Sequence, residues 1–266
     1  MKDSKELLQN EHSQRKRLDT VLFEKKYAKS RGEAHLKIVG GSVLVNGKVC
    51  AKPGHKISGA DSIVVQDNGI KSFVSRGGLK LDGALEEFNI NLENNVCLDV
   101  GASTGGFTDC MLKRGAKKVY ALDVGYGQLD WSLRNDPRVV CIEKTNIRYW
   151  DANEVIEHID FATVDASFIS LTKILPRLKE ILKPPYRIFA LIKPQFEVGP
   201  KKVKKGVVVD DKIREEAVSN IKMFCEDLKF DIKGICRSGI KGPKGNIEYF
   251  IFLENLEVRS RNSEES

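Results

Sequence analysis

Short apolar runs that end in polar or glycine-containing turns recur along the last two thirds of the chain. They predict strands near residues 96–101, 117–123, 138–142, 161–165 and 186–193, with helical stretches between them. Two later runs, near residues 229–237 and 247–253, have little helix between them and are expected to pair antiparallel. Strands that alternate with helices favour a parallel sheet with helices on both faces. The predicted fold class is α/β, a doubly wound sheet with an antiparallel last strand.

The first quarter of the chain has a different pattern. Its predicted elements are two short helices, a strand-turn-strand hairpin and a further strand, over residues 17–27, 30–39, 40–49 and 62–66. Ser30 can cap the second helix, with Glu33 as its reciprocal partner. Asn46-Gly47 is a typical hairpin turn. These elements together predict a compact α+β module.

We therefore predict an N-terminal domain over residues 15–66, a linker over 67–74 and the α/β domain over 75–256. The net charge of +7 is spread unevenly over them. Residues 1–65 hold 13 Lys and Arg against 7 Asp and Glu, whereas residues 66–266 hold 31 against 30. A basic module joined to a nearly neutral body suggests an N-terminal domain that meets a polyanion, although a solvated basic surface would have the same composition.

The composition is typical of a soluble protein, with 41% hydrophobic and 30% charged residues. No apolar run approaches the ~18 to 20 residues that span a membrane, and no apolar stretch near the N-terminus resembles a signal peptide. We expect a cytoplasmic protein without a membrane partner. The six cysteines form no C-x-x-C pair and are expected to be small buried hydrophobic residues, so no metal site is predicted.

One apolar strand runs directly into the turn Gly101-Ala102-Ser103-Thr104-Gly105-Gly106-Phe107, and the next strand ends at Asp123. A turn with little side chain at a helix N-terminus lets a ligand approach the backbone closely. A carboxylate that ends the following strand can accept hydrogen bonds from both hydroxyls of a ribose. The two features predict a pocket for a cofactor that carries a nucleoside, although the turn could also serve only to pack a helix close to a strand.

Other interpretations of this turn have less support. It matches neither the G-x-G-x-x-G pattern of dinucleotide sites nor the Gly-Lys-Ser/Thr ending of a P-loop. Residues 101–105 do satisfy the G-x-S-x-G pattern of a hydrolase nucleophile elbow. The only histidine after Ser103 is His158, in a polar stretch that we expect to be helical, and no HGGG-type oxyanion loop precedes the turn. We therefore do not favour a serine hydrolase.

Four further charged residues are candidates for chemistry: Lys80, Asp165, Lys193 and Glu248. Asp165 and Lys193 end predicted strands, on the side where open α/β sheets bind ligands. Simpler explanations exist, since Lys80 could be a surface residue, Glu248 could protect a strand edge and Asp165 could cap a helix. Lys193 is harder to explain in this way because it ends an apolar run immediately before a proline. A basic run follows in an expected loop beside the site, where an RNA contact is favoured over a solvated face: Lys201, Lys202, Lys204 and Lys205.

The N-terminal pattern resembles the S4 RNA-binding domain. The resemblance rests on Arg17-Leu18-Asp19, Ser30-Arg31, Ala34, Ile38 and Gly41-x-Val43-x-Val45-Asn46-Gly47. It implies a basic helical face that contacts RNA phosphates through Arg17, Lys29, Arg31 and Lys37. Such contacts are sensitive to salt and read base sequence weakly.

The glycine turn and the acid after it resemble the S-adenosylmethionine site of class I methyltransferases. The resemblance implies S-adenosyl-L-methionine as the cofactor, with its ribose bound by Asp123. Asn146 would border the adenine, at a position where relatives commonly have an acid. The implied cofactor-binding residues are Asp99, Gly101, Ala102, Ser103, Gly105, Gly106, Phe107, Asp123 and Asn146.

The four charged residues, in their order along the chain, resemble the Lys-Asp-Lys-Glu tetrad of the FtsJ-like ribose 2′-O-methyltransferases. Over about residues 15–255 the chain resembles the TlyA family, in which an S4 domain precedes such a body. This resemblance implies 2′-O-methylation of cytidine in ribosomal RNA, with ribosomal RNA or ribosomal subunits as partners and no obligate protein partner. Family members have also been named haemolysins, so the alternatives are a cytolysin and an RNA-binding protein without catalytic activity.

The tetrad has a chemical rationale. A ribose 2′-hydroxyl is a weak acid, so a general base must take its proton as the oxygen attacks the methyl carbon. A lysine can do so only when it is neutral, which burial and a second cation nearby, here Lys80, favour. We expect Lys193 to be this base, aligned by Asp165, while Lys80 and Glu248 orient the ribose. Attack on a sulfonium requires no metal.

Overall fold

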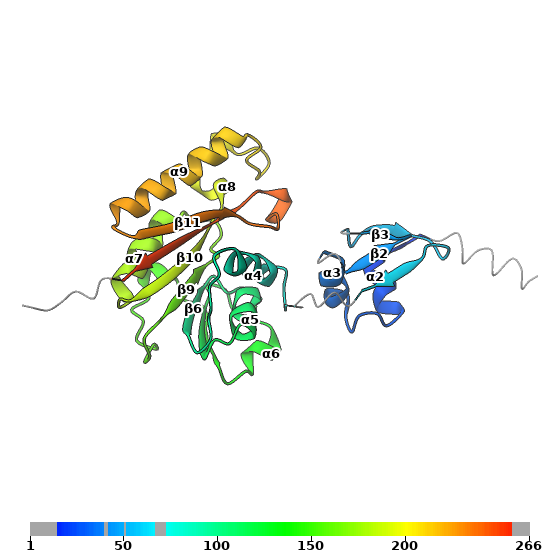
Figure 1. The fold of residues 1–266 in the computed structure, drawn as a ribbon, viewed down its shortest axis with the longest axis horizontal. Helices are drawn as coiled ribbons and strands as arrows, with labels where there is room; N and C mark the ends of the chain where they lie inside the picture. Colours follow the sequence, from blue (N-terminus) through cyan, green and yellow to red (C-terminus); the bar gives the residue numbers. More distant parts are fainter. Residues whose placement is uncertain (1–14, 40–41, 51, 67–72, 257–266) are drawn as a thin grey trace, which may run out of the picture. The chain divides into compact units, whose positions relative to one another are not determined.

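The computed structural model of the chain describes residues 15–39, 42–50, 52–66 and 73–256 (Figure 1). The chain divides into two compact units, residues 1–79 and residues 80–266. Most of the predicted linker, as well as Gly41 of the N-terminal pattern, lies outside the described residues.

Between residues 15 and 66, the described part of the first unit contains two helices and two small antiparallel sheets. Helices α2 and α3 span Leu18–Glu24 and Arg31–Val39. The strands are β1 (Lys16–Arg17) paired with β4 (Lys56–Ile57), and β2 (Val43–Val45) between β3 (Lys48–Val49) and β5 (Ile63–Val65). Apolar side chains from both layers form one buried core: Leu18, Val21, Leu22, Ala28, Ala34, Ile38, Val43, Val45 and Ile57.

The turn and the helix cap predicted for this unit are present in the structure. Asn46 and Gly47 have φ angles of 51° and 75°, the positive values that a two-residue hairpin turn of type I′ requires. Ser30 Oγ accepts the N–H of Glu33 at 3.1 Å. The Glu33 carboxylate accepts the N–H of Lys29, at 2.6 Å, so the reciprocal bond goes one residue further back than predicted.

The second unit is built on a seven-stranded sheet with the order β11-β12-β10-β9-β6-β7-β8. Its strands are β6 (Val96–Val100), β7 (Lys118–Leu122), β8 (Val139–Ile142), β9 (Phe161–Val164), β10 (Tyr186–Ile192), β11 (Asp231–Arg237) and β12 (Tyr249–Asn255). Strands β6 to β10 pair in parallel, whereas β12 runs antiparallel to both β10 and β11. The predicted α/β class, with an antiparallel strand at the end of the chain, is confirmed.

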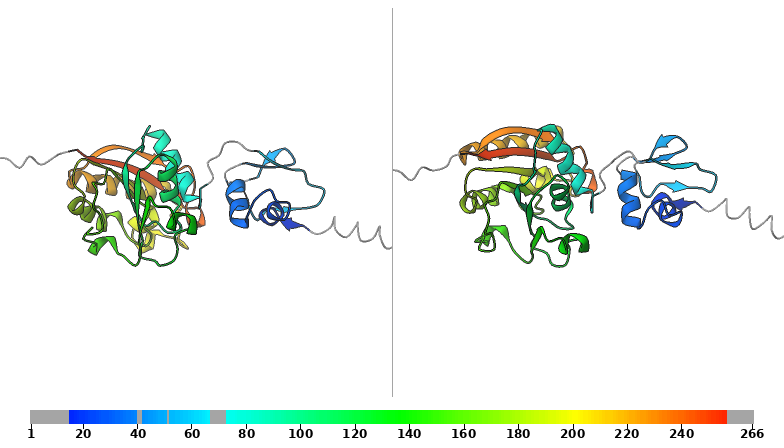
Figure 2. Two further views of the ribbon diagram at one scale, coloured as in Figure 1. Left: turned by 90° about the horizontal axis from the view of Figure 1, so that it is seen from below. Right: turned by 60° about the horizontal axis from the view of Figure 1, so that its bottom comes forward.

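Helices cover both faces of this sheet (Figures 1 and 2). Helices α4 (Gly77–Glu87) and α5 (Gly106–Lys113) pack on one face, and α7 (Leu175–Ile181) and α9 (Asp211–Asp227) pack on the other. Short elements complete the connections: α6 (Trp131–Arg134), α8 (Pro194–Glu197), η1 (Ile147–Tyr149), η2 (Leu171–Lys173), η3 (Pro200–Lys202) and η4 (Pro243–Gly245).

The connection from β8 to β9 differs from the predicted alternation of strands and helices. After η1 it continues as irregular backbone, and His158, expected in a helical stretch, lies within it. Polar side chains form local turns here, because Asp151 Oδ1 accepts the N–H of Asn153 at 3.3 Å and Ala152 has a φ of 61°. Such local hydrogen bonds compete with helical ones, which explains why the helical expectation was wrong.

The strand order reverses beside β6, which lies between β7 and β9. The chain passes from β6 outward to β8 and then returns to β9 on the other side of β6. Open α/β sheets bind ligands at the carboxyl ends of strands where the order reverses in this way. Gly101 and Asp165 follow β6 and β9 directly, so both predicted site residues lie at this reversal.

Candidate active site

A cavity of about 480 Å³ opens at the carboxyl ends of these strands. Five of the residues selected from the sequence line it: Gly101, Ser103, Asp123, Asn146 and Asp165. They come from the ends of β6, β7 and β9 and from the residue before η1. The fold thus brings together residues that are spread over more than sixty positions of the sequence.

The glycine turn is shaped by two backbone positions that exclude larger residues. Gly101 has a φ of 85°, and a Cβ atom there would lie 2.8 Å from the carbonyl oxygen of Asp165. Gly105, the N-cap residue of α5, has a φ of 92°, and its Cβ would lie 2.3 Å from a methyl group of Leu133. Only glycine fits these angles and distances, so the β6 turn can lie directly against the β9 turn.

Asp123 is fixed at the cavity wall by backbone amides. Its Oδ2 accepts the N–H of Ser103 at 2.8 Å, and its Oδ1 accepts the N–H of Gly125 at 2.7 Å. Each carboxylate oxygen keeps a further lone pair, because an ionised carboxylate offers about four acceptor positions. The geometry suits a carboxylate that receives two adjacent hydroxyl groups from the cavity.

The other selected residues of the turn are buried and do not line the cavity: Asp99, Ala102, Gly105, Gly106 and Phe107. Asp99 is fully buried, and its two oxygens accept hydrogen bonds from Thr108 at 2.7 Å and Thr163 at 2.9 Å. Burial raises the pKa of Asp99 to about 6, against the lowering effect of these two bonds. The Asp99 side chain therefore links β6 to α5 and to β9 by hydrogen bonds.

The selected adenine-side residue, Asn146, is tied to the short turn that follows it. Its Oδ1 accepts the N–H of Arg148 at 3.1 Å, which caps η1. Ile147 and Arg148 line the cavity beside it, together with Gln128 from the β7 side. These three residues were not selected from the sequence, because nothing in their local pattern separates them from ordinary loop residues.

Lys80 and Glu248 form a buried ion pair. Lys80 Nζ lies 2.6 Å from Glu248 Oε2, and the two side chains are 6% and 0% exposed. The second oxygen, Glu248 Oε1, accepts a hydrogen bond from Gln195 Nε2 at 3.4 Å. A Cβ at Gly242 would lie 2.0 Å from the same oxygen, so a glycine leaves the room that this carboxylate occupies.

Asp165 and Lys193 form the second ion pair of the site. Lys193 Nζ lies 2.5 Å from Asp165 Oδ1, and it also donates to Ser167 Oγ at 3.0 Å. Asp165 follows β9 and Lys193 follows β10, two neighbouring parallel strands. The contact exists, and the alignment of Lys193 for catalysis by Asp165 stays a prediction.

The two pairs lie at the same end of the sheet, where β10 ends and β12 begins. Ile192 of β10 is opposite Tyr249 of β12, so Lys193 and Glu248 are the next residues of the same two neighbouring strands. Gln195 belongs to α8, which begins directly after Lys193, and reaches Glu248. Ser167 and Gln195 are contacts that sequence analysis missed, although their place two residues after Asp165 and Lys193 offered a signal.

The basic residues selected for RNA contact are exposed or half-buried, and several have acidic partners. Lys201, Lys202, Lys204 and Lys205 are exposed around η3, where Lys202 pairs with Glu216 at 2.6 Å. In the first unit Lys29 is exposed, and Lys37 lies 3.6 Å from Glu33.

Arg17 and Arg31 share one carboxylate. Asp19 is buried at the start of α2 and accepts bonds from Arg17 at 2.8 Å and from Arg31 at 3.4 Å. The Arg17 hydrogen bonds hold the pKa of Asp19 well below its usual range. The carboxylate thus orders two guanidinium groups at the protein surface, which keep one net positive charge between them.

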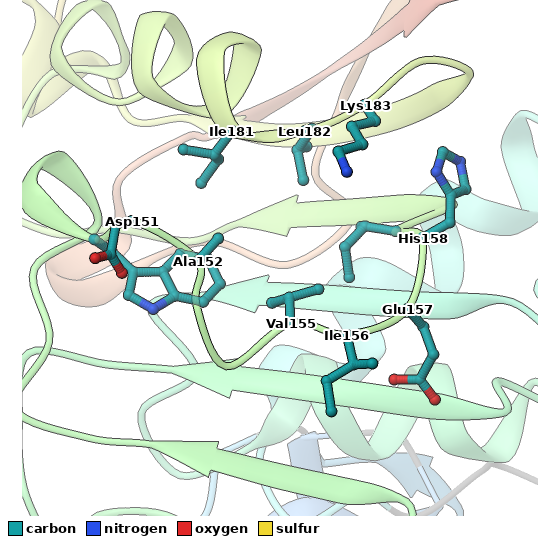
Figure 3. Close-up of a pocket in the computed structure, with 11 residues that line it drawn as sticks. Asp151, Ala152, Val155, Ile156, Glu157, His158, Ile181, Leu182 and Lys183 are labelled. Atoms are coloured by element: carbon teal, nitrogen blue, oxygen red, sulfur yellow. The ribbon is translucent and has the colours of Figure 1, made fainter.

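A second cavity, of about 330 Å³, lies between residues 150–159 and the end of α7 (Figure 3). It is bordered by the irregular segment before β9 and by the residues before β10, including Val155, His158 and Lys183. None of the residues selected from the sequence lines it. The described part of the chain contains no cluster of three His, Cys, Asp or Glu residues suited to a metal, and no helix in it is long and apolar enough to cross a membrane.

Comparisons with known proteins show which families the chain resembles. The profile of the FtsJ-like methyltransferase family matches residues 73–255, and that of the S4 domain matches residues 16–63. The 16S/23S rRNA (cytidine-2′-O)-methyltransferase TlyA of Mycobacterium tuberculosis is 42% identical over 93% of this chain and 93% of its own length. Hemolysin A of Brachyspira hyodysenteriae is 47% identical over 88% of this chain and 97% of its own length. A solved structure of a Streptococcus thermophilus protein whose name includes the word hemolysin has a TM-score of 0.70 and 40% identity, covering 92% of this chain and 90% of the other.

A sheet of this order, with its reversal beside a glycine turn, is the fold of class I methyltransferases, and the family match narrows the class to the FtsJ-like enzymes. The S4 domain that precedes this body is shared with relatives that align over nine tenths of the chain. The chain therefore belongs to the TlyA family.

Proposed function

We propose that the chain transfers a methyl group from S-adenosyl-L-methionine to the 2′-oxygen of a cytidine ribose in ribosomal RNA. One observation carries the proposal: Lys80, Asp165, Lys193 and Glu248 form two ion pairs where β9 and β10 end and β12 begins, and Asp165 lines the cavity. This arrangement supports a catalytic role for the four residues, with Lys193 as the base and Asp165 as its partner.

The cavity suits the cofactor in size and in chemistry. Its volume of about 480 Å³ falls in the usual range of ligand sites. Asp123 would accept the ribose hydroxyls, the turn at Gly101 and Ser103 that lines the cavity would admit the methionine part, and Asn146 would border the adenine. When bound, the cofactor supplies an electrophilic methyl carbon on a positively charged sulfur.

Lys193 acts as the general base on the 2′-hydroxyl. A neutral lysine amine has two N–H groups and one lone pair, and Asp165 and Ser167 are placed to accept from both N–H groups. The lone pair is then left for the hydroxyl proton. Once Lys193 has taken this proton, the Asp165 carboxylate stabilises the ammonium ion at a short distance.

Lys80 and Glu248 act as a fixed, buried pair that orients the ribose. Both side chains are almost fully removed from solvent, so the charge pattern around the reacting oxygen does not need to reorganise during transfer. Alignment of oxygen, methyl carbon and sulfur in one line supplies much of the remaining rate.

The first unit would deliver the substrate. Its shared Arg17–Asp19–Arg31 cluster presents ordered guanidinium groups that suit phosphates, which supports binding to RNA without strong base selection. Ribosomal RNA, and cytidine within it, are proposed from the name of the Mycobacterium tuberculosis relative.

The proposal is tested by incubating the purified chain with labelled S-adenosylmethionine and with unmodified 30S or 50S ribosomal subunits. We expect label in the rRNA, recovered after alkaline hydrolysis in a dinucleotide, because a 2′-O-methyl group blocks strand cleavage at that ribose. Label in a base or in protein, or no transfer despite measurable cofactor binding, would contradict the proposal. The same preparation applied to erythrocytes tests the cytolysin alternative by haemoglobin release.

A further inference from the structure

Two segments leave neighbouring parallel strands at the active site and run side by side. The first begins at Asp165, after β9, and leads to η2. The second begins at Lys193, after β10, and forms α8. The Lys193 contacts with Asp165 and Ser167 join the two segments at their starts. If nothing else joined them, this contact would depend on one flexible lysine side chain.

A second connection joins the same segments further on, through Glu197 at the end of α8. Glu197 Oε2 accepts a hydrogen bond from Ser170 Oγ at 2.5 Å, and Glu197 Oε1 accepts the N–H of Leu171 at 3.0 Å. Ser170 is the N-cap residue of η2, and its Oγ also accepts the N–H of Thr172 at 3.1 Å. One carboxylate therefore holds the far end of the β9 segment.

The stretch between the two connections contains an unfavourable backbone conformation. Phe168 has a φ of 64° and is 91% exposed, and its ring centroid lies 5.1 Å from that of Phe196. A bulky residue in the left-handed region costs on the order of 1–3 kcal/mol and persists only where the surroundings define it strongly. Because the side chain of Phe168 is mostly exposed, little core packing holds it in place, and the connections at both ends of the stretch are what define its backbone.

We infer that Glu197 is a positioning residue for methyl transfer: it locks the Asp165–Ser170 segment against α8, so that Asp165 and Ser167 meet Lys193. The inference rests on the proposed function for its kinetic readout. It assigns to Glu197 no contact with the substrate or the cofactor. Its effect passes through the two partners of Lys193.

The chemistry of the Glu197 side chain suits this role. Its two oxygens are used by different donors on one short turn, so the carboxylate defines both position and orientation of that turn. Burial raises the pKa of Glu197, while the bonds from Ser170 and Leu171 lower it. A half-buried acid held in this way is costly without its two partners, which argues that the connection is specific rather than incidental.

The test compares Glu197→Ala with Glu197→Gln in the full chain. The glutamine amide can still accept the Leu171 N–H and can donate to Ser170 Oγ, whereas alanine removes both bonds. We expect kcat to fall about 10- to 100-fold in Glu197→Ala, as displacements near 1 Å do, with the KM for S-adenosylmethionine within about 2-fold of wild type. Glu197→Gln should keep kcat within about 3-fold of wild type, since both contacts survive.

Glu157→Ala serves as a matched control. Glu157 is also half-buried and also accepts two hydrogen bonds, from Lys118 and Tyr120. It lies beside the second cavity and contacts the start of β7, whereas the active site lies at the carboxyl ends of the strands. We expect this variant to keep the wild-type kcat. If Glu197 served stability alone, Glu197→Ala would unfold at a lower temperature than wild type. Its kcat, measured below that temperature, would then equal that of wild type.

Hydrogen exchange of the peptide that spans residues 165–173 gives a readout that does not depend on the reaction. This peptide should exchange faster in Glu197→Ala than in wild type, and its exchange rate in Glu157→Ala should equal that of wild type. If Glu197→Ala does not fold, Ser170→Ala, which breaks the connection from the other side, replaces it in both measurements. The inference is overturned if the alanine variant keeps wild-type kcat and exchange, or if Glu197→Gln loses as much as alanine. A wild-type chain that transfers no methyl group would refute the proposed function, and exchange would still decide the role of Glu197.

Discussion

The buried pair of Lys80 and Glu248 allows the effects of a charge on stability and on chemistry to be separated. In Lys80→Met the side chain keeps its length but loses its ammonium group. Among the described residues, the Glu248 carboxylate, 0% exposed, would then keep the hydrogen bond from the Gln195 amide at 3.4 Å. Removing one partner of a buried ion pair costs about 3–5 kcal/mol, and the completely buried position of Glu248 places this case within that range.

The double variant Lys80→Met/Glu248→Gln removes both charges. Because the desolvation cost of the two ions disappears together with their attraction, we expect its unfolding free energy to lie within about 1 kcal/mol of wild type. Methyl transfer should remain lost in the double variant, because the charge pattern around the ribose is gone. Stability recovered without activity is the result that assigns the pair to catalysis.

Urea unfolding followed by tryptophan fluorescence measures this stability directly. Both tryptophans of the chain, Trp131 and Trp150, belong to the second unit, so the signal reports the domain that contains the pair. Glu180→Gln, at an exposed site on α7, serves as a control for charge removal. The reasoning is refuted if Lys80→Met costs less than about 1 kcal/mol, or if the double variant methylates RNA at the wild-type rate.

Three further predictions concern the glycine turn and its surroundings. Burial raises the pKa of Asp99 to about 6, so the folded protein holds this proton at a pH where the unfolded chain has lost it. The stability that the protonated form contributes is lost as pH rises through 6. The unfolding free energy of wild type should therefore fall by about 1–2 kcal/mol relative to that of Asp99→Asn between pH 5 and pH 8. Parallel pH profiles of the two proteins would contradict this. Gly101→Ala places a Cβ 2.8 Å from the Asp165 carbonyl oxygen at a φ of 85°. We expect this variant to lose about 2 kcal/mol or more of unfolding free energy in urea and to transfer methyl groups more slowly. A fully active, equally stable variant would show that the close approach of the two turns is not needed. Asp123→Ala should raise the Kd for S-adenosylmethionine about 10- to 100-fold in calorimetry, since charge-assisted hydrogen bonds to the ribose are lost, and an unchanged Kd would remove Asp123 from this role.

Much of the fold follows from short-range patterns in the sequence. Strands β6, β7, β9 and β10 are largely buried, so each consists mainly of apolar residues and ends where a glycine, an acid or a lysine begins. The carboxyl ends of parallel strands share one edge, which is why Asp165 and Lys193 could be placed together without a structure. The exception is the segment before β9, where local turns at Asp151 and Ala152 replace the expected helix.

The partners within the site could not be predicted in the same way. Lys80 and Glu248 are separated by 168 positions, and their contact depends on how α4 packs beside the start of β12. Asp99 was selected because it precedes the glycine turn, yet side chains alternate along a strand, and its own points to Thr108 and Thr163. Glu197 gives no sequence signal beyond its closeness to Lys193, because its role depends on the turn at the end of another strand.

The central claim is that Lys193 takes the proton of the ribose hydroxyl, and a single-turnover measurement tests it most directly. Saturating labelled S-adenosylmethionine and excess Lys193→Ala are mixed with unmodified subunits. Lys183→Ala serves as the control, because Lys183 is an exposed lysine that precedes the start of β10, whereas Lys193 follows its end. We predict that Lys193→Ala binds the cofactor with a Kd near that of wild type but transfers methyl groups at least about 100-fold more slowly, while Lys183→Ala keeps the wild-type rate. A Lys193→Ala rate equal to that of wild type would contradict the account.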